Sequence, residues 1–515
     1  MSVPDFLERG ALLNPDGICM QKDEQVFTYR QVLDLCFRAA NTLLAAGYGP
    51  GRNAAVLCDN DPTGFACSFG IMRAGMAYVP MDFRNSVEEN HRILEFGDAE
   101  VLFFQARFDD QVRELRKRLP KLQIFICIDA ELPGFPALEQ WYGGSAACSP
   151  ALEVSLEATA WLQTGSGTSG DFKMAEMTHR MYTAFVTYSL LWLPDSAPVM
   201  LVAAPITHAG GGLAYHVLAT GGKLVLLDKP DPQLVLEAIQ QHRITKLFLP
   251  PTVIYRLMAQ PNVREFDLSS LKYLAFSAAP MAVEKIREAI ELFGPVIAQG
   301  YGQTEGLGIT AMHPEEFLID GAIAPDDRLS ACGRPSLPFC RAVILAEDGK
   351  ILPQGETGEI CVRGDQVMKG YYKNPAATAA TIVDGWLHTG DIGYFDKDGY
   401  LHIVDRKKDM IISGGFNVYS SEVEQVIFSH AAVLECVVIG VPHPEWGEAV
   451  KAVIAIKPGA QVTSEEVINW CKGRLSSVKV PKTVDFVTEL PKNQRGKVLK
   501  RVLRDPYWAG QARKI

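Results

Sequence analysis

The first half of the chain alternates short apolar runs with helical segments, and this alternation constrains the fold more than any other feature. Residues 54–58, 77–80 and 101–104 are short runs of almost purely apolar side chains. Residues 29–46 and 64–74 carry apolar side chains at helical spacing. Buried strands that alternate with helices are typical of mostly parallel sheets. The pattern therefore predicts layered α/β subdomains.

The pattern of predicted strands changes towards the C-terminus. Further buried strands are predicted at residues 199–204, 223–227, 246–249 and 273–276. After about residue 340, short strands punctuated by Gly and Asp predict an antiparallel β subdomain.

The charged segment Asp405-Arg-Lys-Lys-Asp409 is a candidate domain boundary. A compact α+β pattern follows it, in which predicted helices alternate with predicted strands. We therefore expect a large N-terminal domain over residues 1–405, which holds the α/β and β subdomains. A small C-terminal α+β domain is expected over residues 410–515.

Length and charge bound the class of protein. A chain of 515 residues is expected to form two to four folding units at roughly 100–200 residues each. Its net charge of −10 argues against a general nucleic-acid binder, because that role needs a basic surface. The basic residues gather in residues 472–515, which hold 12 Lys and Arg against 3 Asp and Glu. This segment either approaches polyanionic small molecules or is a solvated basic surface.

The cysteines and the N-terminus exclude several other classes. No two of the 11 cysteines form a C-x-x-C pair, so zinc-ribbon and redox motifs are unsupported. The N-terminus lacks a cationic start followed by an apolar core. No run approaches the roughly 18 apolar residues that a membrane span needs. We expect a cytoplasmic protein.

A Gly- and hydroxyl-rich loop follows the apolar stretch 158–162. Its candidate phosphate-binding residues are Thr164, Ser166, Gly167, Thr168, Ser169, Gly170 and Lys173. Glycines let the backbone approach phosphates, hydroxyls add donors, and a lysine supplies a positive charge. A flexible linker would have a similar composition. The loop does not fit the Walker pattern, because Phe172 precedes Lys173.

Five further motifs follow this loop. They are Pro205-Ile-Thr-His208-Ala-Gly210, Ser277-Ala278-Ala279-Pro280, Tyr301-Gly302-Gln-Thr304-Glu305, Thr389-Gly390-Asp391 with Arg406 downstream, and Pro491-Lys-Asn-Gln-Arg-Gly496-Lys497. Taken singly, each is also compatible with ordinary buried or surface residues. Together and in this order, they resemble the adenylate-forming superfamily, which comprises acyl-CoA synthetases, peptide-synthetase adenylation domains and firefly-type luciferases. The resemblance runs from about residue 28 to the C-terminus.

The resemblance implies a binding site for ATP and Mg²⁺. Tyr301 would stack on adenine beside Gly302, and the turn from Ser277 to Pro280 would cradle the base. Thr304 would donate to the α-phosphate, and Glu305 would ligate Mg²⁺ through its hard carboxylate oxygens. Asp391 would accept the ribose hydroxyls, with Arg406 as a second contact.

The resemblance also implies the catalytic residues and a domain rotation. Lys497 would place a cation between the attacking carboxylate and the α-phosphate, and His208 would lie beside the carboxylate. Residues 406–409 would form the hinge about which a mobile C-terminal domain rotates, with Lys408 as the hinge residue. Phe172 and Met174 depart from the family pattern, where Pro and Gly are usual.

The acceptor of the acyl group is left open between coenzyme A and an amine. In the family, Gly414 and Gly415 would line the pantetheine tunnel, and Trp446 would lie beside the CoA nucleotide. A structural role for Trp446 is the alternative. Val478 stands where an aromatic residue is usual, and Val480 stands where some CoA ligases have an Arg.

The expected function is that of an AMP-forming acid–CoA ligase. The substrate pocket is predicted from Phe185, Tyr188, Gly210, Gly211, Gly300, Gly306 and Leu307. Its aromatic and small residues favour an aromatic or medium-chain acid. The alternatives are a stand-alone amide-bond ligase and, in a different class, a non-catalytic nucleotide- or acyl-binding relative.

Overall fold

The computed structural model describes residues 1–165, 172–207, 209–336, 338–492 and 498–509. These residues divide into two compact units. The first unit holds the described residues up to Ala342 together with Val362–Leu387. The second unit holds Val343–Cys361 and the described residues from His388 onward. The predicted mobile domain and its hinge at residues 406–409 remain a prediction.

The first unit contains two large sheets. In spatial order, one sheet consists of β17 (Arg334–Pro335), β14 (Leu307–Met312), β13 (Ile297–Gln303), β12 (Tyr273–Phe276), β11 (Lys246–Phe248), β9 (Val199–Val202), β10 (Lys223–Leu226), β1 (Ile18–Lys22) and β2 (Gln25–Thr28). The other consists of β20 (Gly370–Tyr371), β8 (Met174–Thr178), β7 (Thr159–Thr164), β4 (Ala77–Pro80), β3 (Asn53–Leu57), β5 (Ala99–Phe104) and β6 (Ile124–Cys127).

The centres of both sheets are parallel, as the alternating pattern predicts. Strands β9 to β13 pair in parallel, and so do β3 to β7. Antiparallel strands extend the edges, since β14 pairs antiparallel with β13 and β8 pairs antiparallel with β7. The mixed α/β fold class is therefore confirmed.

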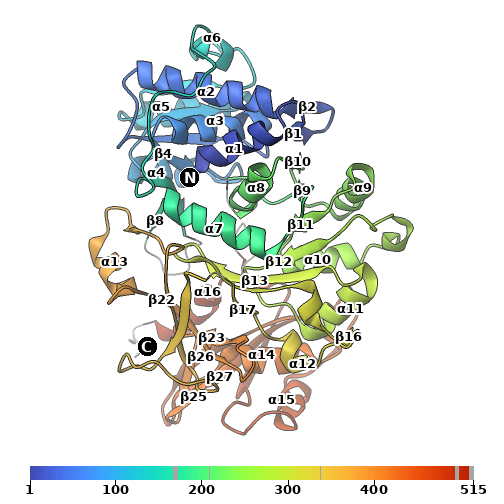
Figure 1. Ribbon diagram of the computed structural model, residues 1–515. Coiled ribbons are helices and arrows are strands. Elements are labelled where there is room, and N and C mark those ends of the chain that lie inside the picture. The colour runs from blue at the N-terminus through green and yellow to red at the C-terminus, as the bar shows by residue number, and fades with distance from the viewer. Residues whose placement is uncertain (166–171, 208, 337, 493–497, 510–515) are drawn as a thin grey trace. The chain divides into compact units, whose positions relative to one another are not determined.

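Helices cover these sheets (Figure 1). They are α1 (Val3–Leu13), α2 (Tyr29–Ala45), α3 (Pro62–Arg73), α4 (Val87–Phe96), α5 (Asp109–Arg118), α6 (Leu138–Tyr142), α7 (His179–Trp192), α8 (Ala209–Ala219), α9 (Pro232–His242), α10 (Pro251–Met258), α11 (Val283–Phe293), α12 (Asp326–Leu329) and α13 (Pro375–Thr381). Helix α2 begins with a capping box in which the Thr28 side chain accepts from the Gln31 backbone N–H. Its apolar stripe packs against α3, with Cys36, Ala39 and Ala40 buried.

The second unit combines short strands with a compact α+β portion. Its elements, of which β18, β19 and β22 begin or end in the first unit, are β18 (Arg341–Leu345), β19 (Gly358–Arg363), β22 (Trp386–Phe395), β23 (Leu401–Arg406), β24 (Ile411–Ser413), β25 (Phe416–Val418), α14 (Ser420–Phe428), β26 (Val433–His443), β27 (Gly447–Ile456), α15 (Ser464–Lys472), β28 (Thr483–Val487) and α16 (Lys500–Arg504). Strands β22 and β23 pair antiparallel, as expected for a β subdomain. An apolar core lies between the sheet of β24, β26 and β27 and helices α14 and α15. Within the described ranges, no helix has the length and apolarity needed to cross a bilayer.

Candidate active site

The motif at residues 301–305 forms one end of a β-hairpin in the first unit. Tyr301 and Gly302 lie near the end of β13, which closes with Gln303, and the turn Thr304-Glu305-Gly306 leads into β14. The Gly306 backbone N–H donates to the Gln303 carbonyl over 3.0 Å. A Cβ at position 302 would lie 1.6 Å from the Leu307 carbonyl oxygen, so this position requires glycine. The hairpin thus presents Glu305 at its tip.

A tyrosine that was not singled out from the sequence holds this glutamate. The Tyr371 hydroxyl, on β20, donates to Glu305 Oε1 over 2.7 Å. The Met368 backbone N–H also donates to the Glu305 carbonyl over 2.9 Å. Burial, and then the charge of Glu305, raise the pKa of Tyr371, so it remains a donor at neutral pH. No motif in the sequence links these two residues.

Lys173 lies over the ring of Tyr371. Its Nζ is 5.0 Å from the centroid of the Tyr371 ring. The lysine is positioned by the ladder between β7 and β8, in which Thr164 pairs with Met174. Phe172 packs edge-on against Phe96 with ring centroids 5.3 Å apart. The end of the predicted phosphate loop is therefore joined through Tyr371 to the predicted Mg²⁺ ligand Glu305.

The predicted adenine turn lies at the carboxyl end of β12. Ser277 is half-buried, while Ala278, Ala279 and Pro280 are exposed. Because β12 and β13 are parallel neighbours, the turn and Tyr301 lie at the same sheet edge. Ala278 adopts φ +71°, a left-handed conformation that costs a non-glycine residue about 1–3 kcal/mol. Strain of this kind is concentrated at functional sites.

An aromatic wall on α7 faces the predicted acid-binding strands. Tyr188 is buried, and its hydroxyl donates to the Thr310 carbonyl over 2.8 Å. A Cβ at Gly300 would lie 2.7 Å from the Tyr188 hydroxyl, and one at Gly308 would lie 2.6 Å from its ring. Phe185 is half-buried and stacks on Tyr188 with centroids 5.9 Å apart. The structure thus brings Phe185, Tyr188 and Gly300 together.

The other predicted pocket glycines fit against backbone and side chains. A Cβ at Gly210 would lie 2.8 Å from the Ala204 carbonyl oxygen, and one at Gly211 would lie 1.9 Å from that of Ile206. A Cβ at Gly306 would lie 2.7 Å from the Leu387 side chain. Close approach of neighbouring groups accounts for these glycines. Leu307, which follows Gly306, adopts φ +33° at the start of β14.

The predicted ribose residues form a pair in the second unit. Asp391 on β22 lies opposite Arg406 on β23, and Arg406 Nε is 3.3 Å from Asp391 Oδ1. Asp391 is buried, and its backbone N–H donates to the Thr389 hydroxyl oxygen over 3.1 Å. Burial, and next the positive charge of Arg406, lower the pKa of Lys408. Arg504 donates to the Lys408 carbonyl over 3.2 Å.

The predicted CoA-binding residues also come together in the second unit. Gly414 and Gly415, at φ +58° and +82°, form the two-residue turn between β24 and β25. The Gly414 backbone N–H donates to the Trp446 carbonyl over 2.9 Å. His443 stacks on Trp446 with centroids 4.2 Å apart, and Lys482 Nζ lies 5.0 Å from the indole centroid. An aromatic pair with an adjacent cation suits a phosphorylated nucleotide.

Seven predicted site residues lie outside the described residues. They are Ser166, Gly167, Thr168, Ser169, Gly170, His208 and Lys497. Their roles therefore remain predictions from the sequence.

Comparison with known proteins shows the family of this chain. Residues 7–372 match the AMP-binding enzyme family, and residues 422–497 match the AMP-binding enzyme C-terminal domain. The chain is 35% identical over 504 residues to a feruloyl-CoA synthase of Amycolatopsis sp., which covers 96% of this chain and 97% of the relative. It is 38% identical over 373 residues to the medium/long-chain-fatty-acid–CoA ligase FadD8 of Mycobacterium tuberculosis, which covers 71% of this chain and 64% of that enzyme.

A solved structure is similar over the same length. The amide bond synthetase McbA from Marinactinospora thermotolerans superposes with a TM-score of 0.88 at 30% identity, covering 98% of this chain and 100% of McbA. A family match over more than half of the chain, together with relatives of this identity, establishes the family to which the chain belongs. The chain belongs to the AMP-binding enzyme family and is an adenylate-forming enzyme.

Proposed function

We propose that this enzyme is an AMP-forming acid–CoA ligase that acts on an aromatic carboxylic acid. In the first step, a carboxylate oxygen attacks the α-phosphorus of ATP, and pyrophosphate leaves. In the second, the CoA sulfur attacks the acyl carbonyl, and AMP leaves. The observation that carries this proposal is the full-length similarity to feruloyl-CoA synthase, combined with the contacts at Glu305.

The geometry around Glu305 suits the first step. Its carboxylate is a partly exposed hard oxygen donor at the tip of a hairpin, which fits Mg²⁺. Bound Mg²⁺ would neutralise charge on the phosphates, and Glu305 would hold it. Tyr371 fixes the carboxylate by its hydrogen bond, and Lys173 adds a cation beside the same tyrosine. Lys497 is proposed to bridge the two reacting anions, with His208 beside the acid.

The second step rests on the C-terminal residues of the second unit. The turn at Gly414 and Gly415 is bonded to Trp446, and Lys482 lies beside the indole. This arrangement supports recognition of CoA through stacking and through a phosphate contact. Lys479, the other cation of this region, is engaged with both carboxylate oxygens of Glu422. The hydrophobic residues Val478 and Val480 pack into or against the core of this unit.

An amide-forming reaction is the second candidate, because McbA is an amide bond synthetase of the same fold. Two relatives named for CoA, the feruloyl-CoA synthase and FadD8, are 35% and 38% identical to this chain, against 30% for McbA. CoA is therefore the favoured acceptor.

The aromatic wall supports an aromatic acid. Tyr188 and Trp192 are both buried, and their rings lie 5.5 Å apart. Phe185 extends this stack towards solvent. Flat rings pack well on such a surface. A medium-chain acid is the alternative, since FadD8 is named for fatty acids.

The test is a panel of carboxylic acids scored by pyrophosphate release, with CoA, with an amine or with neither. We expect aromatic acids to give the highest rates and CoA thioesters as products. Acid-dependent pyrophosphate release that yields an amide and no thioester would replace CoA by an amine. Absence of pyrophosphate release with every acid would argue against adenylation.

A further inference from the structure

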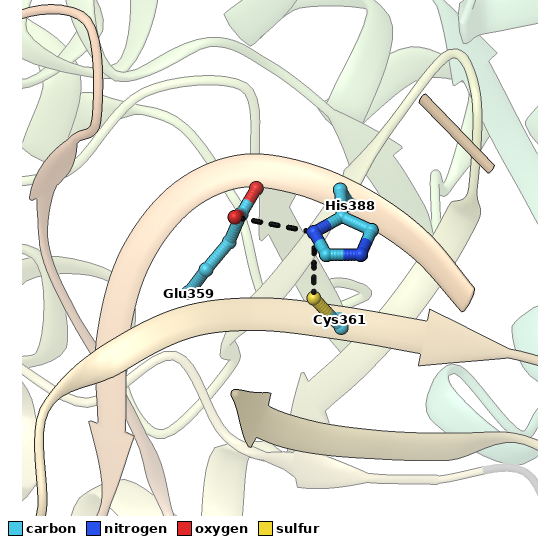
Figure 2. A group of neighbouring side chains, drawn as sticks. All are labelled: Glu359, Cys361 and His388. Atoms are coloured by element: carbon cyan, nitrogen blue, oxygen red, sulfur yellow. Dashed lines mark hydrogen bonds and ion pairs between the residues drawn. The ribbon is translucent and has the colours of Figure 1, made fainter. Parts of the chain in front are cut away.

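A carboxylate, a thiol and an imidazole converge in the second unit (Figure 2). Glu359 and Cys361 are two residues apart on β19 and therefore project from the same face of the strand. His388 lies on β22. Its Nδ1 is 3.5 Å from Cys361 Sγ and 3.2 Å from Glu359 Oε2. All three ligand atoms lie within 4.8 Å of one another.

This arrangement does not suit a nucleophilic triad. In such a triad, the nucleophile contacts one nitrogen of the imidazole and the carboxylate contacts the other. Here Cys361 and Glu359 both contact Nδ1 of His388. A proton could not be relayed from the thiol through the ring to the carboxylate.

The spacing instead matches the coordination shell of a zinc ion. Zinc takes nitrogen and oxygen ligands at about 2.0 Å and thiolate sulfur at about 2.3 Å, so tetrahedral ligand atoms lie roughly 3.3–3.6 Å apart. The two printed separations, 3.2 and 3.5 Å, are close to these values. Thiolate and imidazole ligands favour zinc over magnesium or calcium. We propose that Glu359, Cys361 and His388 form a Zn²⁺-binding site with one position open to solvent.

Without a metal ion, Lys407 supplies the positive charge beside Glu359. Its Nζ lies 3.0 Å from Glu359 Oε2, and its side chain is 51% exposed. A bound dication would replace this ammonium, which could turn into solvent. The Gly390 backbone N–H holds the other oxygen of Glu359 over 3.1 Å, so the carboxylate is already oriented. None of the three proposed ligands is a residue assigned to adenylation or to CoA, whereas Gly390 and Lys407, which contact Glu359, lie in the predicted ribose motif and hinge.

Binding must release one proton. Burial, and then Glu359, raise the pKa of Cys361 to about 12, so the thiol is protonated at neutral pH. When the Zn–S bond forms, the S–H bond breaks and the proton passes to solvent. His388 binds as the neutral imidazole and Glu359 as the carboxylate.

The test uses the full-length chain without a histidine tag. Co²⁺ is titrated first, because a Co²⁺–thiolate bond gives a charge-transfer band that reports on cysteine ligation, and Zn²⁺ is then added in competition. We expect a single equivalent to bind. Cys361→Ala should abolish the band, and His388→Gln should weaken binding by about tenfold or more. Lys407→Ala should tighten binding, because it removes the competing cation.

Matched controls are needed in a chain with 11 cysteines and 10 histidines. Cys148→Ser removes an exposed thiol, and His402→Gln breaks a histidine–carboxylate pair that lacks a cysteine. Both should bind Co²⁺ as the wild type does. The proposal is overturned if the wild type gives no charge-transfer band, or if the band survives Cys361→Ala. If Cys361→Ala does not fold, unchanged affinity in both His388→Gln and Lys407→Ala overturns it equally.

Discussion

The Tyr371 hydroxyl donates a 2.7 Å hydrogen bond to the carboxylate of Glu305, a residue 66 positions earlier in the chain. The contact joins the short strand β20 to the turn between β13 and β14. It orients the proposed Mg²⁺ ligand before any substrate binds. Preorganised groups of this kind avoid reorganisation during the reaction.

Tyr371→Phe should slow pyrophosphate release by roughly ten- to a hundredfold, because a hydrogen bond to a charged group contributes roughly 1.5–3 kcal/mol. The measurement is acid-dependent pyrophosphate release without CoA, over a range of Mg²⁺ concentrations. The matched control is Tyr372→Phe, whose hydroxyl donates instead to Asp98 over 2.9 Å. Equal effects of the two variants would contradict a specific role for Tyr371.

Trp446→Ala should raise the KM for CoA by roughly two- to tenfold, since an aromatic stacking contact contributes roughly 0.5–1.5 kcal/mol. Pyrophosphate release without CoA should be unchanged. Trp470→Ala, at a second half-exposed tryptophan of the same unit, serves as the control. An unchanged KM for CoA in Trp446→Ala would remove this residue from the acceptor site.

Lys497→Ala should abolish acyl-AMP formation and leave thioester formation from preformed acyl-AMP largely intact. The reason is that a cation between two reacting anions is needed only in the first step. Both half-reactions are followed by chromatography of acyl-AMP and thioester. Arg495→Ala, in the same basic segment of the sequence, is the control for a general loss of charge. Equal loss in both half-reactions would contradict the assigned role.

Gly308→Ala should destabilise the protein by about 1–3 kcal/mol, because the added methyl group would overlap the buried Tyr188 ring. The midpoint of urea unfolding measures the effect. Gly473→Ala is the matched control, since no atom lies within 4 Å of a Cβ at that position. A midpoint equal to that of the wild type would show that α7 can shift to accept the methyl group.

Acidification should destabilise the fold partly through His179. Its Nδ1 accepts a 3.1 Å hydrogen bond from the Val3 backbone N–H, and burial lowers its pKa to about 4. Its pKa in the unfolded chain is about 6.5, so the unfolded state binds more protons in the interval between these values. Stability should therefore fall as pH decreases from about 6.5 to about 4.

His179→Gln should flatten this pH dependence of the unfolding midpoint, since the amide does not titrate. Part of the slope should remain, because burial also lowers the pKa of His216, to about 3. His430→Gln changes a half-exposed histidine and should keep the wild-type profile. A wild-type slope in His179→Gln would contradict the assignment.

Local patterns predicted much of the secondary structure. Strands β4 and β12 occupy the predicted residues 77–80 and 273–276, and α2 ends one residue before the predicted limit. Apolar periodicity is a property of neighbouring residues, so it is visible in the sequence. Strand β22 runs from Trp386 to Phe395. Its middle, His388-Thr-Gly-Asp391, is polar and gives no apolar run.

The family motifs predicted more than secondary structure. They identified the chain as an adenylate-forming enzyme, because each motif joins several functional residues in one short stretch. Contacts between distant segments had no such mark in the sequence. The hydrogen bond from Tyr371 to Glu305, the packing of Gly308 on Tyr188 and the convergence of His388 on Cys361 were all decided by the tertiary structure. The physical reason is that periodicity and turn chemistry act over a few residues, whereas strand order and register determine which remote side chains meet.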